Sequence, residues 1–232
     1  MKKSTVLFLL MIATLLGCKK GASTPQTDVP IPETSAVVES YSNVVVLGNS
    51  ITRASPDTSI GWNNNWGMAA TRPELDYLHL LTARLKLINP NVVVNSMPTG
   101  EFEVAYKTYD YTDYYAAIKA SKPDLLILRF GENIVQDSPD LVYFDEKYAA
   151  LIAYFKDGNP NLKILAAGSF WGNPVADKAM AKYSKFVTLT PLLNDINNQA
   201  FGIFPNNSVA IHPSDKGMLA ICNIIWEGLK GL

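Results

Sequence analysis

Ser50 and His212 are the two residues of this sequence best suited to nucleophilic chemistry. Ser50 follows the apolar run 44–47 and Gly48, where a strand would end, and His212 precedes a proline that suits a helix start. A serine hydroxyl attacks an ester once a base with a pKa near the working pH takes its proton, and histidine is the usual base. The other histidine, His79, lies among leucines in a helical pattern. The pair predicts a serine nucleophile with His212 as base, although Ser50 would also suit a plain strand-to-helix turn.

Acyl transfer also requires hydrogen-bond donors for the negative charge that develops on the carbonyl oxygen. The N–H of Ser50, the N–H of Gly100 and the side-chain amide of Asn133 are the candidates. Taken singly, Gly100 could simply turn the chain and Asn133 could cap a loop. Taken together, the chain order Ser, Gly, Asn, His predicts an oxyanion hole formed by Ser50, Gly100 and Asn133.

Five short apolar runs predict the strands that would position these groups. Most are continuous in apolar character, which is typical of strands covered on both faces; they lie at 43–48, 91–97, 124–131, 163–170 and 185–191. Helical patterns alternate with them, at 73–88, 143–158 and 213–231. This alternation predicts an α/β fold with a central parallel sheet. In such sheets functional groups collect at the carboxyl ends of the strands, where we expect the candidate residues to meet.

The segments that carry these residues resemble the sequence blocks of the SGNH (GDSL-type) hydrolases. GNSI, which contains Ser50, resembles the nucleophile block, with Asn49 where Asp is usual. GENI resembles the third block through Asn133, and IHPSDKGM resembles the last block through the His-Pro pair at His212. Gly100 resembles the glycine of the second block. The resemblance covers about residues 40–232 and implies a flavodoxin-like three-layer α/β/α sandwich with a central parallel sheet.

One position departs from the pattern of that family. The family has Asp three residues before the histidine, and here that position is Val209. Such an Asp holds the imidazole tautomer and stabilises the imidazolium, which valine cannot do. Three groups could replace it: a backbone carbonyl from 208–210, which we favour, the carboxylate of Asp215, or the carboxylate of Glu132. The departure also fits a relative that has lost its activity.

Aromatic and amide side chains near the expected site are candidates for binding a sugar. The substrate-binding candidates are Asn49, Trp62, Trp66, Arg129 and Trp171. A sugar ring offers an apolar face to an aromatic ring and hydroxyls to amides. As an equal alternative, Trp62 and Trp66 could close a small satellite core under a long loop. For Arg129 we favour an ion pair with Glu132 over binding an anionic substrate group.

The N-terminal residues predict export. Residues 1–17 have a basic start and a short apolar stretch, as a signal peptide does, and they end at Cys18 in LLGC. This resembles a bacterial lipoprotein signal, in which Cys18 is lipidated. Residues 18–36 read as a flexible tether rich in Pro, Ser and Thr, and 37–232 as the catalytic domain. We therefore expect a membrane-anchored lipoprotein of the bacterial cell envelope, in the periplasm or at the cell surface.

Composition excludes several other classes of protein. The net charge of -1 gives no footprint for nucleic acid. Two histidines, of which one is helical, do not predict a metal site, and no glycine-rich nucleotide motif is present, so we expect neither metal nor cofactor. Cys222, among aliphatic residues, reads as a small buried apolar residue.

Combined with export, the resemblance implies a serine esterase that removes O-acyl groups, here expected to be acetyl, from a carbohydrate or glycan. The alternatives are a catalytically impaired glycan-binding lipoprotein of the same fold, and a lipase or thioesterase.

Overall fold

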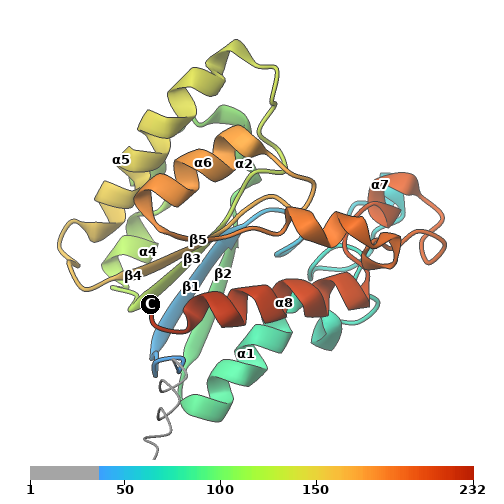
Figure 1. The fold of residues 1–232 in the computed structure, drawn as a ribbon, viewed down its shortest axis with the longest axis horizontal. Coiled ribbons are helices and arrows are strands. Elements are labelled where there is room, and N and C mark those ends of the chain that lie inside the picture. Colours follow the sequence, from blue (N-terminus) through green and yellow to red (C-terminus); the bar gives the residue numbers. More distant parts are fainter. Residues whose placement is uncertain (1–36) are drawn as a thin grey trace, which may run out of the picture. The chain divides into compact units, whose positions relative to one another are not determined.

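The computed structural model describes residues 37–232 (Figure 1). The predicted signal peptide at 1–17, and Cys18 with the tether at 18–36, lie outside the described residues. Of the helices within residues 37–232, none is both long and apolar enough to span a membrane.

A five-stranded parallel sheet forms the centre of the fold, with the strand order β2-β1-β3-β4-β5. Its strands are β1 (Asn43–Gly48), β2 (Val93–Pro98), β3 (Leu125–Arg129), β4 (Lys163–Ala167) and β5 (Lys185–Val187). This is the order of flavodoxin-like doubly wound folds. Helices cover both faces of the sheet (Figure 1), so the predicted three-layer α/β/α architecture is confirmed.

The remaining elements of residues 37–232 are helical. The α-helices are α1 (Tyr77–Ile88), α2 (Gly100–Ala105), α3 (Tyr111–Tyr114), α4 (Ala116–Ala120), α5 (Phe144–Lys156), α6 (Pro174–Tyr183), α7 (Asn207–Ala210) and α8 (Asp215–Leu229). Short 3₁₀ helices occupy Thr58–Ile60, Pro73–Leu75, Pro139–Tyr143, Thr190–Asn194 and Ile196–Asn198.

Successive side chains of the central strand β1 point to opposite faces of the sheet, as strand geometry requires. Val44 and Val46 join the apolar cluster under α1 and α8. Val45 and Leu47 join the second cluster, under α5 and α6. Both faces of β1 are therefore buried against apolar side chains. This explains why the strand sequences are continuously apolar rather than alternating between apolar and polar residues.

The structure differs from the sequence prediction at the ends of some elements. β2 is an edge strand with exposed and half-buried residues, because only β1 flanks it. β5 ends at Val187, and a 3₁₀ helix with a proline in its first turn follows. The last helix begins at Asp215 rather than Pro213, because the Ser214 side chain caps it by accepting the N–H of Gly217.

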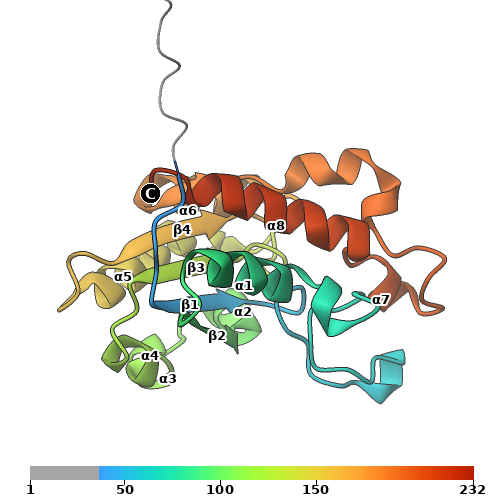
Figure 2. The ribbon, with the colours of Figure 1, turned by 90° about the horizontal axis from the view of Figure 1, so that it is seen from below.

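A third, smaller cluster lies at the carboxyl end of the sheet. The long segment between β1 and α1 contributes Trp62 and Met68, and the segment around α7 contributes Ala200 and Val209. Figure 2 shows these two segments side by side. The loop that carries His212 is therefore held against the segment that follows Ser50.

Gly217 tests how tightly the loop before α8 is packed. Its backbone lies against the carbonyl of Asn198, and an added Cβ would overlap that oxygen. In an isolated helix, replacing glycine by alanine stabilises the helix by about 1 kcal/mol. In this protein the overlap should instead make Gly217→Ala lower the free energy of unfolding by about 1–3 kcal/mol. Urea unfolding of Gly217→Ala measures this, with the exposed helical substitution Lys178→Ala as control. A Gly217→Ala protein more stable than the parent would contradict the packing described.

Candidate active site

Ser50 and His212 meet at the carboxyl end of the sheet. Ser50 lies in the turn directly after β1, and His212 lies between α7 and α8. Ser50 Oγ is 3.0 Å from His212 Nε2, although the residues are 162 positions apart. Ser50 is half-buried and His212 is 7% exposed. For Nε2 to accept the serine proton, the ring proton must lie on Nδ1. The pair thus has the geometry of a nucleophile and its base.

Backbone hydrogen bonds and an aromatic ring position the imidazole. The N–H of His212 donates to the carbonyl of Val209, and its own carbonyl accepts from Ala200 N–H, both at 3.0 Å. The Trp171 ring stands edge-on to the imidazole, with centroids 5.1 Å apart at 85°. Trp171 Nε1 donates to the carbonyl of Ile211, which fixes the indole beside the histidine.

The imidazole has no carboxylate partner. Asp215 accepts from the N–H and hydroxyl of Thr71, and Glu132 accepts from groups described below. The two carboxylate alternatives for orienting His212, Asp215 and Glu132, are therefore wrong, since both are bonded elsewhere. The favoured carbonyl partner is met only in part. The backbone carbonyls of Ser208 and Val209 lie close enough to the ring to raise its pKa, although neither makes a well-formed hydrogen bond with Nδ1.

Burial dominates the proton affinity of His212. It lowers the pKa to about 4, and the positive charge of Arg129 acts in the same direction. The carbonyls of Ser208 and Val209 oppose this shift. His212 is consequently neutral, and able to accept a proton, at every pH above about 5.

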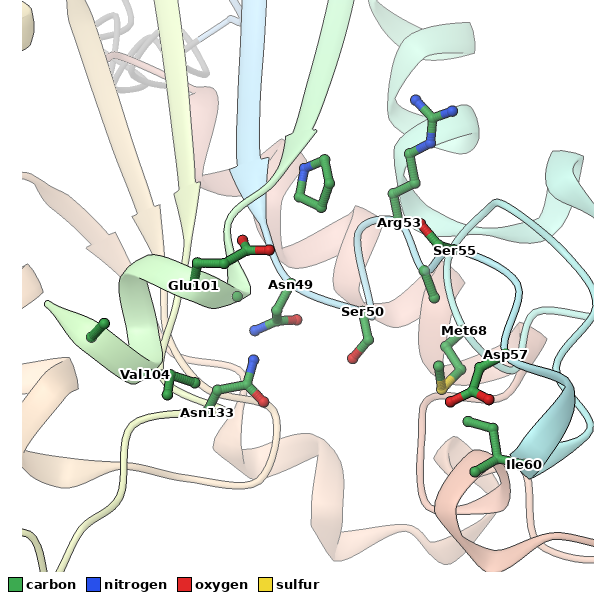
Figure 3. Close-up of a pocket in the computed structure, with 14 residues that line it drawn as sticks. Asn49, Ser50, Arg53, Ser55, Asp57, Ile60, Met68, Glu101, Val104 and Asn133 are labelled. Atoms are coloured by element: carbon green, nitrogen blue, oxygen red, sulfur yellow. The ribbon is translucent and has the colours of Figure 1, made fainter. Parts of the chain in front are cut away.

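The candidate oxyanion donors line the same cleft as Ser50. This cleft has a volume of about 640 Å³ and includes Gly100 and Asn133. Gly100 opens α2, where first-turn N–H groups have no acceptor within the helix. A Cβ at Gly100 would lie 3.6 Å from Asn133 Nδ2, so the two donors are neighbours. In Figure 3, Asn133 and Glu101 lie on one side of Ser50, and Met68 and Ile60 on the other.

A buried charged cluster lies directly beneath Ser50. Arg129 donates to Asn49 Oδ1 at 2.7 Å and forms an ion pair with Glu132 at 2.9 Å. Glu132 also accepts from Asn49 Nδ2 at 2.6 Å and from the N–H of Phe170 at 2.6 Å. The predicted ion pair between Arg129 and Glu132 is confirmed, and its side chains are fully buried.

Glu103 of α2 completes this cluster, and sequence reasoning missed it. Its carboxylate accepts from Asn133 Nδ2 at 2.9 Å, from Gly131 N–H at 2.6 Å and from Asn49 Nδ2 at 3.0 Å. One hydrogen of the Asn133 amide is thereby held by Glu103, which leaves the other for the cleft. No local pattern marked Glu103, because the neighbouring Glu101 is exposed and the two look alike in sequence.

Two buried carboxylates, Glu103 and Glu132, lie close together in this cluster, and only Glu132 is paired with Arg129. Glu103 therefore has a high proton affinity. Burial, and then the charge of Glu132, raise the pKa of Glu103 to about 7. The hydrogen bonds from Gly131, Asn49 and Asn133 lower it in part. An amide at position 49 therefore serves better than an acid, because its NH₂ group donates to both carboxylates while its oxygen accepts from Arg129.

Most of the predicted substrate-binding residues prove to be internal. Arg129 is fully buried and paired, so it does not reach a substrate. Asn49 borders the cleft, but its amide is committed to Arg129 and the two glutamates. Trp62 is 1% exposed and belongs to the third apolar cluster, so the satellite-core alternative is the correct one for it.

Trp66 and Trp171 keep part of their surface accessible. Trp171 lies against His212. Trp66 contacts Trp62 edge-to-face, with centroids 5.9 Å apart, and borders a separate cleft. Cys222 is buried in α8, and burial raises the pKa of its thiol to about 11. Residues 37–232 contain no grouping of three or more His, Cys, Asp or Glu side chains suited to a metal ion.

Comparison with known proteins finds matches among solved structures alone. No family model matches the chain, and no curated protein matches it. A two-domain esterase active on acetylated mannans is 19% identical with a TM-score of 0.52 over 81% of this chain; the match spans 48% of the esterase, about half its length. A GDSL-like lipase from Bacteroides ovatus is 20% identical, with a TM-score of 0.51 over 81% of this chain and 97% of the lipase. A GDSL-like lipase from Parabacteroides merdae is 18% identical, with a TM-score of 0.52 over 85% of this chain and all of the lipase.

Asn49→Asp tests the charge balance under Ser50. It would place a third carboxylate in a cluster whose one cation is Arg129, and an uncompensated buried charge costs roughly 3 kcal/mol or more. Protonation relieves that cost, so the loss of unfolding free energy should be large at pH 8 and smaller at pH 5. Chemical unfolding at both pH values measures it, with Asn63→Asp in the exposed loop as matched control. An equal effect of Asn49→Asp and Asn63→Asp at pH 8 would refute this account of the cluster.

Proposed function

We propose that this chain, which has the fold of the SGNH (GDSL-type) hydrolases, is a serine esterase that removes O-acetyl groups from a carbohydrate. The observation that carries the proposal is the 3.0 Å approach of Ser50 Oγ to His212 Nε2. Gly100 and Asn133 support it by bordering the same cleft as Ser50.

The first half of the reaction transfers the acyl group to the enzyme. Ser50 Oγ attacks the ester carbonyl carbon while His212 Nε2 takes the hydroxyl proton. The N–H groups of Ser50 and Gly100 and the amide of Asn133 stabilise the resulting oxyanion. The bond to the sugar oxygen then breaks, and His212 returns the proton to that oxygen, which leaves an acyl-Ser50 ester.

The second half releases the acid. A water molecule attacks the acyl carbon while His212 Nε2 takes a proton from it. The oxyanion is stabilised by the same donors. When the bond to Ser50 Oγ breaks, the proton passes from His212 to the serine, and acetate leaves.

A carbohydrate ester is supported by the exposed surfaces near the site and by one similar structure. Trp66 and Trp171 are partly accessible, and an esterase with the same fold is described as active on acetylated mannans. We also propose that the protein is exported and held at the cell envelope through Cys18, where it would meet polysaccharide. That placement rests on the leader pattern of the sequence.

One observation favours a second candidate, a glycan-binding protein of the same fold that has lost catalysis. The His212 ring has no carboxylate partner, and only the backbone carbonyls of Ser208 and Val209 favour its protonated form, so nothing with a full negative charge would stabilise the imidazolium. A third candidate, a lipase or thioesterase, draws support from the apolar cleft walls, which include Ile60, Met68 and Val104.

Hydrolysis of p-nitrophenyl acetate separates these candidates. We expect turnover by the wild type and a loss of at least about 10³-fold in Ser50→Ala, because a missing triad nucleophile costs that much or more. Asn133→Ala should lower kcat by about 10²-fold, because one oxyanion donor is worth that amount, and it should also destabilise the fold by about 1–3 kcal/mol, because Glu103 loses a donor. If wild type and Ser50→Ala behave alike, the binding protein is the correct reading. Faster turnover of p-nitrophenyl octanoate than acetate would favour a lipase.

The pH dependence of kcat/KM reports on His212. Because the base must be neutral and its pKa is lowered to about 4, activity should rise with pH through about 4 and stay level above about 6. An ordinary histidine would place that rise near 6.5. A second change in kcat/KM near pH 7 that is absent from the Glu103→Gln variant would report the titration of Glu103, whose pKa is raised to about 7. A rise near 6.5 that persists in Glu103→Gln would contradict the buried, neutral His212.

A further inference from the structure

A second cleft lies beside the catalytic one and has no part in the chemistry above. Its volume is about 450 Å³. It is bordered by the first turns of α1, by the edge strand β2 and by the loop before α1, through His79, Thr82, Ser96, Asn65 and Trp66. These walls come from segments that are separate in sequence, so the cleft is a product of the fold rather than of one loop.

Arg53 joins the two clefts. It borders both of them and is exposed. Its backbone N–H donates to the carbonyl of Asn49 at 3.0 Å, which ties it to the turn that carries Ser50. Figure 3 shows its side chain extending away from Ser50. Among residues 37–232, no carboxylate lies within ion-pair distance of its guanidinium. Five N–H donors are therefore available at the junction.

The walls of the second cleft combine one aromatic ring with several polar groups. Trp66 is fixed by its Nε1 donating to the carbonyl of Ala70 at 2.9 Å. His79 Nδ1 is bonded to Asp76 at 2.9 Å, so Nε2 remains for a ligand. The hydroxyl of Thr82 donates to the carbonyl of Leu78, so its oxygen can still accept. An apolar ring with a few placed donors and acceptors is typical of a site for a small polar molecule.

We propose that the second cleft is a subsite for a sugar unit that neighbours the unit carrying the ester. Trp66 would contact an apolar face of the ring, while Arg53, Asn65, Ser96 and His79 would bind its hydroxyls. Arg53 would contact both units, because it stands at the junction of the two clefts. This inference rests on the proposed carbohydrate esterase function and extends it to a preference for oligosaccharides over single sugars.

The test compares substrates of different length on a cleft-filling variant. The probes are O-acetylated mono- and trisaccharides of mannose, xylose and glucose, with p-nitrophenyl acetate as the small reference ester. In at least one sugar series the wild type should show a kcat/KM about tenfold higher for the trisaccharide, equivalent to one useful subsite. Ser96→Trp, which fills the second cleft from β2, should remove that gain when activities are expressed relative to p-nitrophenyl acetate.

Asn95→Trp is the matched control, because neighbouring residues of a strand point to opposite faces. It should retain the gain for the trisaccharide. If Ser96→Trp fails to fold, Asn65→Ala combined with His79→Ala should reduce the same gain. No wild-type gain in any series, or an undiminished gain in a folded Ser96→Trp, would overturn the subsite. Absence of p-nitrophenyl acetate turnover in the wild type would instead overturn the esterase function itself.

Discussion

The buried guanidinium of Arg129 connects the turns that carry the reactive groups. It bonds Asn49, the residue before Ser50, and Glu132, the residue before Asn133. A charge removed from water is costly unless it is paired and hydrogen-bonded, and both terminal nitrogens of Arg129 have such partners. The side chains around Arg129 therefore have little freedom, and neither do the backbones on which they stand. The distance between Ser50 and Asn133 is therefore set by the buried contacts of Arg129 with the residues that precede them, Asn49 and Glu132.

Glu103 extends this arrangement to the oxyanion side of the site. It accepts from the Asn133 amide and from the N–H of Gly131, and it shares the Asn49 amide with Glu132. Donors oriented before the substrate arrives need no reorganisation as charge develops, which is where most of their catalytic value lies. The cost is a crowded pair of carboxylates, seen in the raised pKa of Glu103. An amide at position 49 lowers that cost by donating to both.

His212 is held in a different way from the other reactive groups. Backbone bonds to Val209 and Ala200 and the Trp171 ring position the imidazole, whereas no carboxylate contacts it. Packing alone can hold a base in place, but it provides no negative charge to stabilise the imidazolium. On the proposed mechanism, hydrogen bonds preorganise the oxyanion side of the site, whereas packing and backbone contacts alone hold the base.

The amino-acid pattern was sufficient for the α/β architecture and for selecting Ser50 and His212, since strand and helix periodicity is local and few residue types can act as nucleophile and base. It also anticipated the ion pair between Arg129 and Glu132, which lie three residues apart. Tertiary packing decided the rest. Trp62 is buried in the core and does not contact a substrate, and the Asn49 side chain is buried among charged groups. Glu103, rather than the similar Glu101, belongs to the charged cluster. The reason is physical: a buried polar side chain is defined by its partners, and those partners come from segments 28 to 83 residues away.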